Sequence, residues 1–154
     1  MRTVVLVLSV IAIVYGALVA MVQPDLRKVL SYSSISHLGF IMLGCFALTQ
    51  TAVQGAVMIM VNHGITTSAL FLLAGVLRER GGHDTLAGYG GLARIMPLFA
   101  VMLTLSMLST VGLPGTNGFV GEFLVLIGSF GREPWLAGLA TTGVIFAAVY
   151  ALRA

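Results

Sequence analysis

The sequence predicts an all-α integral membrane protein with about five transmembrane helices, one of them discontinuous. Three observations support this fold class. The chain of 154 residues is 58% hydrophobic and only 8% charged, whereas a soluble domain carries roughly a quarter charged residues. Its apolar residues form runs of about 20, the length that a helix needs to cross the hydrocarbon core of a bilayer. One run is much longer and contains a proline and several glycines.

Short polar stretches separate the apolar runs and so define a single membrane domain over 1–154. The expected spans are residues 3–22, 29–48, 55–77, 95–130 and 135–152. The stretch TQTAVQ (49–54) is typical of a short turn, and RERGGHDTLAGYGGLAR (78–94) is the longest expected loop. The first run resembles a cleaved leader, but its length favours a retained helix.

The run 95–130 is too long to be one straight span. A helix of 36 residues would measure about 54 Å, against about 30 Å for the hydrocarbon core. Pro114 lacks a backbone N–H and clashes with the preceding turn. We therefore expect two half-helices joined by an unwound hinge at Gly112, Pro114, Gly115 and Gly118. Broken helices of this kind mark ion and substrate sites in transporters, although a simple proline kink is the alternative.

Glu122 lies about one turn into the second of these half-helices. A charged acid at the bilayer centre costs about 2.5–3.5 kcal/mol on insertion scales. An acid kept at that depth therefore suggests a group that gains and loses a proton. The alternative, an acid that snorkels to the membrane interface, does not fit its position deep inside the run.

His63 lies near the middle of the third expected span, in VNHGITT. Asn62 precedes Thr66 by four residues and His63 precedes Thr67 by four, so these polar side chains stack along the helix. Imidazole titrates near physiological pH and can pass a proton through either ring nitrogen. The alternative is a neutral histidine that hydrogen-bonds between helices.

His37 ends the stretch SYSSISH in the second expected span. Ser33 lies one turn before it and Ser34 lies near the same face. This pattern predicts a hydrated stripe, although serines also serve as small packing residues between membrane helices. His37, His63 and Glu122 each stand alone on their span, without an HxxxH or ExxH pair, so we expect no metal site.

The charged residues lie mainly in the predicted loops. Asp25, Arg27 and Lys28 precede the second span and suit a membrane anchor. Basic residues are more numerous on one side, which predicts a cytoplasmic C-terminus and an external N-terminus. The richer side carries Arg27, Lys28, Arg78, Arg80, Arg94 and Arg153, and the other side carries Arg2 and Arg132. The sequence has no basic patch with interleaved aromatic residues, which is the pattern that indicates nucleic-acid binding. Its one cysteine, Cys45, excludes a thiolate metal site within the chain.

Three segments together resemble the M-type subunit (chain 4 in mitochondria) of the proton-pumping NADH:quinone oxidoreductase, respiratory complex I. They read QPDLRKVLSYSSISHLGFIMLG, QGAVMIMVNHGITTSALFLLAG and GLPGTNGFVGEFLVLIGSF, and the resemblance runs from about residue 12 to about residue 131. Related antiporter-like subunits usually carry a lysine in place of Glu122, after a GIPP-type break. The acid and the spelling LPGTNGF therefore favour the M type.

The resemblance implies two inverted five-helix repeats, each with one broken helix, of which this chain is the second. It also implies that Glu122 stands at one end of a chain of buried ionisable groups that includes His37 and His63, joined by water. The family's first repeat carries a glutamate and buried lysines that nothing here replaces. On this view the chain is partial and holds half of a proton route.

The resemblance further implies that this chain binds no redox cofactor. NADH, FMN, iron–sulfur clusters and quinone are expected in other subunits. The implied partners are the other membrane-arm subunits, the first repeat of the same subunit and the lipid bilayer. The implied location is the bacterial inner (plasma) membrane.

Two other functions remain open on the sequence. A subunit of a related monovalent cation/proton antiporter or of a membrane-bound hydrogenase would share the fold. A structural membrane scaffold would use the same polar residues only to join helices, and it predicts that Glu122→Gln is harmless because an amide still forms hydrogen bonds.

Overall fold

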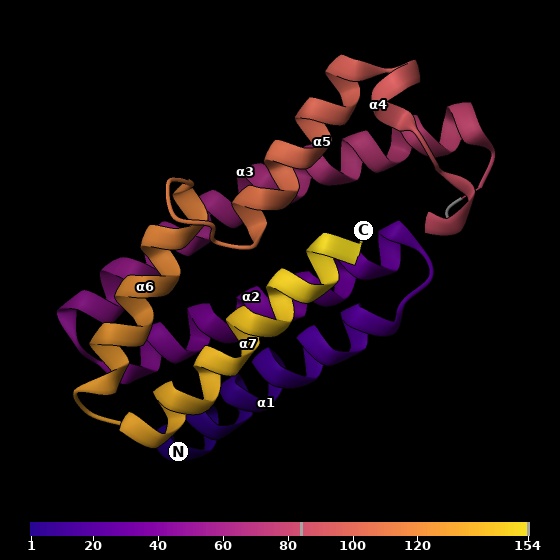
Figure 1. The fold of residues 1–154 in the computed structure, drawn as a ribbon. Coiled ribbons are helices and arrows are strands. Elements are labelled where there is room, and N and C mark those ends of the chain that lie inside the picture. Colours follow the sequence, from indigo (N-terminus) through magenta and orange to yellow (C-terminus); the bar gives the residue numbers. More distant parts are fainter. Residues whose placement is uncertain (84, 154) are drawn as a thin grey trace.

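The computed structural model describes residues 1–83 and 85–153, and every regular element within them is helical (Figure 1). The predicted all-α fold is therefore confirmed. In chain order the elements are α1 (Arg2–Val22), α2 (Leu26–Ala47), α3 (Gln50–Gly81), the 3₁₀ turn η1 (Leu86–Gly88), α4 (Leu92–Ile95), α5 (Pro97–Thr110), α6 (Asn117–Phe130) and α7 (Pro134–Arg153).

Four of these helices, α1, α2, α3 and α7, are long and apolar enough to cross a membrane. The apolar helices α5 and α6 are shorter, with 14 residues each. They are the two halves of the expected broken helix, and residues 111–116 between them form turns. The predicted discontinuity is thus confirmed, because the backbone leaves the helical path where Gly112, Pro114 and Gly115 occur.

The turn between α2 and α3 is shorter than the sequence predicts. Only Leu48 and Thr49 separate the two helices, so residues 50–54 are helical and not part of a turn. Leu48 adopts a left-handed conformation with φ 56°. The Thr49 hydroxyl then accepts a hydrogen bond from the Ala52 amide and caps α3, which satisfies a donor that the first turn of a helix leaves unpaired.

The helices pack in two groups, and contacts between α2 and α3 connect one group to the other (Figure 1). Helices α1, α2 and α7 lie side by side, while α3 packs along the broken helix. The α6 half contacts the first part of α3, and the α5 half contacts its last turns through Leu70, Ala74 and Met107. Helix α3 therefore runs past the break and supports both halves.

Close backbone contact holds α6 against α3. A Cβ atom built on Gly55 of α3 would lie 2.7 Å from the Val125 amide nitrogen of α6 and 2.8 Å from the Gly121 carbonyl oxygen. Small residues at such crossings allow helices to approach closely in a membrane, where burial of apolar surface contributes little. The position of Glu122, next to Gly121 on α6, is set by this crossing.

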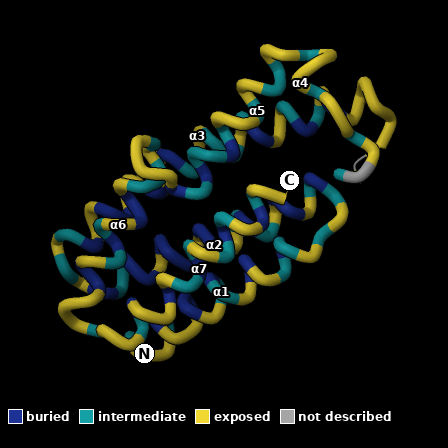
Figure 2. Tube along the Cα trace, viewed as in Figure 1, coloured by how far each residue is buried: buried dark blue, intermediate teal, exposed yellow. Residues whose placement is uncertain are grey.

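The outer surface of the bundle is strongly apolar. Large apolar side chains on α3, α4 and α5 are mostly exposed, for example Leu72 (74%), Ile95 (76%) and Leu98 (72%). Figure 2 shows exposed residues along α4 and α5, while buried residues concentrate where α1, α2, α3 and α6 meet. Such a surface is unsuited to water and suits contact with lipid chains.

Candidate functional site

The break between α5 and α6 lies beside the middle of α3. Gly112 and Gly115 turn the chain there with φ values of 70° and 101°, a region that favours glycine. The Asn62 side-chain amide on α3 donates a 2.7 Å hydrogen bond to the Asn117 carbonyl at the start of α6. The Ser109 hydroxyl near the end of α5 donates to the Asn117 side-chain oxygen. Polar contacts thus tie both half-helices to each other and to α3.

The geometry around Gly112 leaves room for the Glu122 carboxylate. A Cβ atom at Gly112 would lie 2.6 Å from Glu122 Oε2. Gly118 likewise allows the start of α6 to approach the end of α5, because an added Cβ would collide with the Ser109 carbonyl oxygen. The glycines of the hinge therefore do more than relax the backbone, since their missing side chains create the space that the carboxylate occupies.

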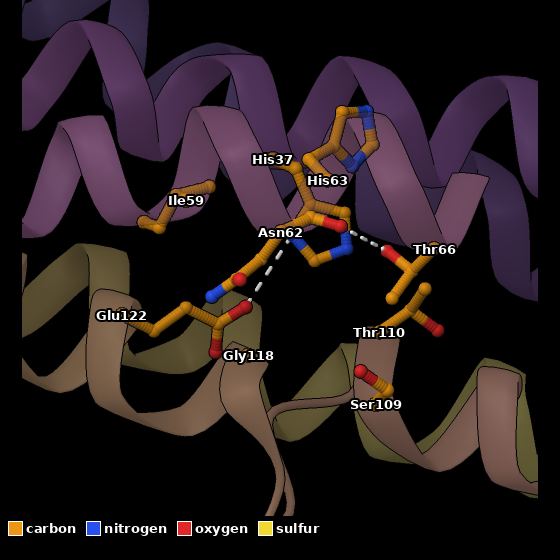
Figure 3. Close-up of a pocket in the computed structure, with 9 residues that line it drawn as sticks. All are labelled: His37, Ile59, Asn62, His63, Thr66, Ser109, Thr110, Gly118 and Glu122. Carbon is orange, nitrogen blue, oxygen red and sulfur yellow. Dashed lines mark hydrogen bonds and ion pairs between the residues drawn. The ribbon is translucent and has the colours of Figure 1, made fainter. Parts of the chain in front are cut away.

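Glu122 and His37 form a buried pair at the centre of the site (Figure 3). Glu122 Oε1 lies 3.3 Å from His37 Nδ1. Each residue is only 5% exposed. The structure thus joins two residues that are 85 positions apart in the sequence, from α6 and α2. A carboxyl and an imidazole at this distance can share or exchange one proton.

His63 extends the pair toward α3. Its ring centroid lies 5.1 Å from that of His37, with the two planes tilted by 44°. The Thr67 hydroxyl lies 3.1 Å from His63 Nδ1 and so orients the ring. His63 is half-buried, whereas His37 is buried. Three ionisable groups on three different helices are therefore contiguous. His63, on α3, is the least buried of the three.

A small cavity of about 20 Å³ lies among these groups. The residues that line it are His37, Ile59, Asn62, His63, Thr66, Ser109, Thr110, Gly118 and Glu122 (Figure 3). A polar space of this size holds about one water molecule. His37 Nε2 is buried and has no hydrogen-bond partner among the described residues. A water in the cavity can satisfy such a nitrogen, since buried polar atoms are normally paired.

The two predicted serines lie apart from this cavity. Ser33 Oγ and Ser34 Oγ both donate to the Leu30 carbonyl of their own helix, at 2.8 and 3.1 Å. Their hydroxyl protons are therefore occupied within α2. The neighbouring Ser36, which the sequence analysis did not select, donates to the Ile13 carbonyl at 3.0 Å and joins α2 to α1.

The predicted loop charges also lie outside the cavity. Lys28 Nζ lies 3.0 Å from Asp25 Oδ2 at the start of α2, and Arg27 is adjacent to them. Lys28 lies nine positions before His37, a distance of about 14 Å along a helix. Among residues 1–83 and 85–153, no group of three or more His, Cys, Asp or Glu side chains is arranged to hold a metal ion.

Three polar residues of the site, Ser109, Thr110 and Asn117, could not be selected from the sequence alone. They flank the break on both sides, in the stretches STVG and TNG. Only a general signal was present, because unwound backbone at membrane depth requires polar partners. The contact between Asn62 and Asn117 had no such signal, since it joins residues 55 positions apart.

The chain is similar to known membrane subunits over its whole length. Residues 1–147 match the family described as NADH:quinone oxidoreductase/Mrp antiporter, TM. The NADH-quinone oxidoreductase subunit M of Rhodobacter capsulatus is 47% identical over 152 residues, which cover 99% of this chain and 30% of that protein.

Two solved structures share the fold. A chain of respiratory complex I from Thermus thermophilus with bound NADH has a TM-score of 0.96 and 41% identity, over 99% of this chain and 32% of that one. A chain of the Mrp complex from a Dietzia species has a TM-score of 0.94 and 27% identity, over 99% and 29%. The chain thus spans about a third of the length of the relatives that it matches.

Proposed function

The chain belongs to the NADH:quinone oxidoreductase/Mrp antiporter transmembrane family, and from this membership we propose that it is a proton-relaying part of an M-type membrane-arm subunit. In this proposal the relay runs through Glu122, His37 and His63 and is coupled to electron transfer from NADH to quinone in other subunits. The observation that carries it is the buried contact of 3.3 Å between Glu122 and His37 beside the helix break.

The relay follows from the two nitrogens of the His37 ring. A protonated Glu122 carboxyl transfers its proton to His37 Nδ1 over the 3.3 Å contact. The imidazolium then releases a proton from Nε2, which has no partner among the described residues and can contact a water in the neighbouring cavity. Because imidazole accepts at one nitrogen and releases at the other, the step moves one proton and restores a neutral ring.

His63 receives the proton from that water or controls its release. Its ring lies 5.1 Å from His37, so a second positive charge there opposes a charge on His37. Coupled groups of this kind titrate as a set, and a charge change on one neighbour shifts the proton occupancy of the others. Charge movements in adjacent subunits can thereby load and unload the relay.

The test is Glu122→Gln in the full-length subunit within the assembled complex. Glutamine keeps the size and hydrogen bonding of the side chain but cannot carry a proton. We expect NADH-driven proton uptake into inverted vesicles to fall about tenfold or more, with assembly intact on a native gel. The matched control is Glu133→Gln, because Glu133 is about one-third exposed and pairs with Arg2 at the end of the bundle. Normal uptake in Glu122→Gln would instead make Glu122 a structural residue.

The second candidate function is a subunit of a monovalent cation/proton antiporter or a membrane-bound hydrogenase. The similarity to a chain of the Mrp complex, with a TM-score of 0.94, favours the antiporter within this alternative. Its proton relay would be the same, but the coupled ion would differ. Sodium or potassium flux that depends on Glu122 in vesicles, without NADH oxidation, would support it.

The location and orientation belong to the same proposal. We place the chain in the bacterial inner membrane, with α1 starting outside and α7 ending in the cytoplasm. The distribution of charge supports this orientation. Arg2 lies 3.4 Å from Glu133 at one end of the bundle, whereas Asp25 and Lys28 lie at the other end, together with the longest basic loop. Positive charge prefers the cytoplasmic side.

The partners and cofactors complete the proposal. The half-buried His63 and the exposed Gly64 beside it suit a contact with the first repeat of the same subunit, which would extend the relay. Other membrane-arm subunits and lipid would cover the remaining apolar surface. NADH, FMN, iron–sulfur clusters and quinone are assigned to other subunits, since an iron–sulfur cluster requires several thiolate ligands and the sequence contains one cysteine.

A further inference from the structure

A second buried polar group lies outside the cavity, in the last turns of α7. Tyr150 is 3% exposed. Its hydroxyl has no hydrogen-bond partner among the described residues. Buried tyrosine hydroxyls usually find a partner, because an unpaired one loses its hydrogen bonds to water without replacement. A hydroxyl kept in this position is therefore expected to contact water.

Tyr150 lies close to the relay. It packs in an apolar cluster with Ala17, Ala20 and Val29, and Val29 lies one turn before Ser33 on α2. No hydrogen bond joins the Ser33 and Tyr150 hydroxyls directly, so a link between them requires a water. Ser33 instead donates its proton to the Leu30 carbonyl, so its oxygen remains free to accept one.

Ser33 links Tyr150 to the Glu122–His37 pair. It lies four residues before His37 on α2, hence one turn nearer the end of the bundle that carries Asp25 and Lys28. Tyr150 lies in the same direction, because Arg153, one turn further along α7, donates a hydrogen bond to the Met21 carbonyl at that end. The two hydroxyls thus extend from the buried pair toward one membrane surface.

We propose that Tyr150 is a further proton-carrying residue, which with Ser33 and intervening water continues the Glu122–His37 pair toward the Asp25–Lys28 end of the bundle. This inference rests on the proposed function. A phenol carries a proton by accepting one from water on its oxygen while it releases its own proton to the next acceptor. One proton enters and one leaves, so no charge remains on the ring. Phenylalanine fills the same space but cannot do this.

The experiment compares Tyr150→Phe with Tyr15→Phe in the full-length subunit of the assembled complex. Tyr15 is the matched control, because it is 60% exposed on α1. We expect Tyr150→Phe to slow NADH-driven proton uptake into inverted vesicles about tenfold, to change its solvent isotope effect in D₂O and to leave assembly intact. Tyr15→Phe is expected to behave as the unchanged protein. A slower rate with an unchanged isotope effect would overturn the inference, since it would show a packing role.

Glu122→Gln, measured in parallel, separates this inference from the proposed function. If Tyr150→Phe retains normal uptake while Glu122→Gln loses it, the inference fails and the relay stands. If both retain normal uptake, the proposed function fails as well. If the Tyr150→Phe complex does not assemble, proton uptake is measured in Ser33→Ala, which removes one hydroxyl from the same proposed path. Slowed uptake with an altered isotope effect would then support the path, and normal uptake would overturn it.

Discussion

Helix α3 and the broken helix α5–α6 lie against each other, yet one is continuous and the other is not. Helix α3 has 32 residues without interruption, whereas residues 111–116 interrupt its neighbour. Both contain glycines within their apolar runs. In α3, Gly64 and Gly75 remain helical, with no atom within 4 Å of an added Cβ. In its neighbour, Gly112 and Gly115 have positive φ values on either side of Pro114.

The difference shows what each kind of helix can hold at membrane depth. The Thr66 and Ser68 hydroxyls of α3 are satisfied within the helix, since they donate to the Asn62 and Gly64 carbonyls at 2.8 and 2.7 Å. The Glu122 carboxylate needs free volume and a partner from another helix, and the break supplies the volume at Gly112. A continuous helix therefore suffices for an imidazole, whereas the carboxylate lies where the backbone opens.

The largest expected effect in this comparison comes from Gly112→Ala. The new Cβ would lie 2.6 Å from Glu122 Oε2 at a residue with φ 70°, and the left-handed conformation alone costs about 1–3 kcal/mol for a residue other than glycine. We expect proton uptake to be lost and hydrogen exchange in residues 111–117 to accelerate in the assembled complex.

Gly75→Ala is the matched control on the continuous helix. An added Cβ meets nothing within 4 Å there, and alanine favours a helix by up to about 1 kcal/mol over glycine. Proton uptake and exchange should remain unchanged. Equal effects of the two substitutions would contradict the distinction between the two helices.

A smaller effect is expected from Asn62→Ala, which removes the polar contact between α3 and the start of α6. The lost 2.7 Å hydrogen bond to Asn117 is worth about 0.6–2 kcal/mol. Hydrogen exchange should accelerate at residues 111–117 and not along α3. Thr142→Ala, whose hydroxyl only contacts its own helix at Leu139, should change neither region. Unchanged exchange at 111–117 in Asn62→Ala would show that packing alone holds the break.

The smallest effect is expected from Thr67→Val, which acts within the continuous helix. Valine keeps the shape of threonine but loses the hydroxyl that lies 3.1 Å from His63 Nδ1. A hydrogen bond of about 0.6 kcal/mol corresponds to a two- to threefold slower proton uptake, with assembly unchanged. Thr142→Val serves as the control. A loss as large as that of Glu122→Gln would show that the His63 orientation limits the relay.

Much of the fold could be predicted from the sequence. Bilayer thickness fixes the length of an apolar run, and proline and glycine fix where a helix must break, so 95–130 was separated correctly into two halves. The turn at 49–54 was misjudged because Thr49 caps a helix that begins one residue later. The polar composition of this stretch predicted a loop, but the Thr49 hydroxyl caps the first turn of α3, so the residues after it are helical.

The candidate site was only partly predictable. Glu122, His37 and His63 could be chosen because ionisable groups are costly at membrane depth. Their adjacency across α2, α3 and α6, and the roles of Ser109, Thr110 and Asn117, depend on how the helices cross. Ser34 matched the same sequence pattern, but its proton is bonded within α2.

The sequence by itself determined which segments suit a membrane, where one helix breaks and which three ionisable residues lie deep in the apolar runs. These properties depend on local chemistry, namely apolar length, the missing N–H of proline and the cost of burying charge. Only the tertiary structure decided that Glu122 faces His37 at 3.3 Å and that Tyr150 is buried. Such pairs join distant residues through close helix crossings at Gly55 and Gly121, and packing between helices selects those crossings.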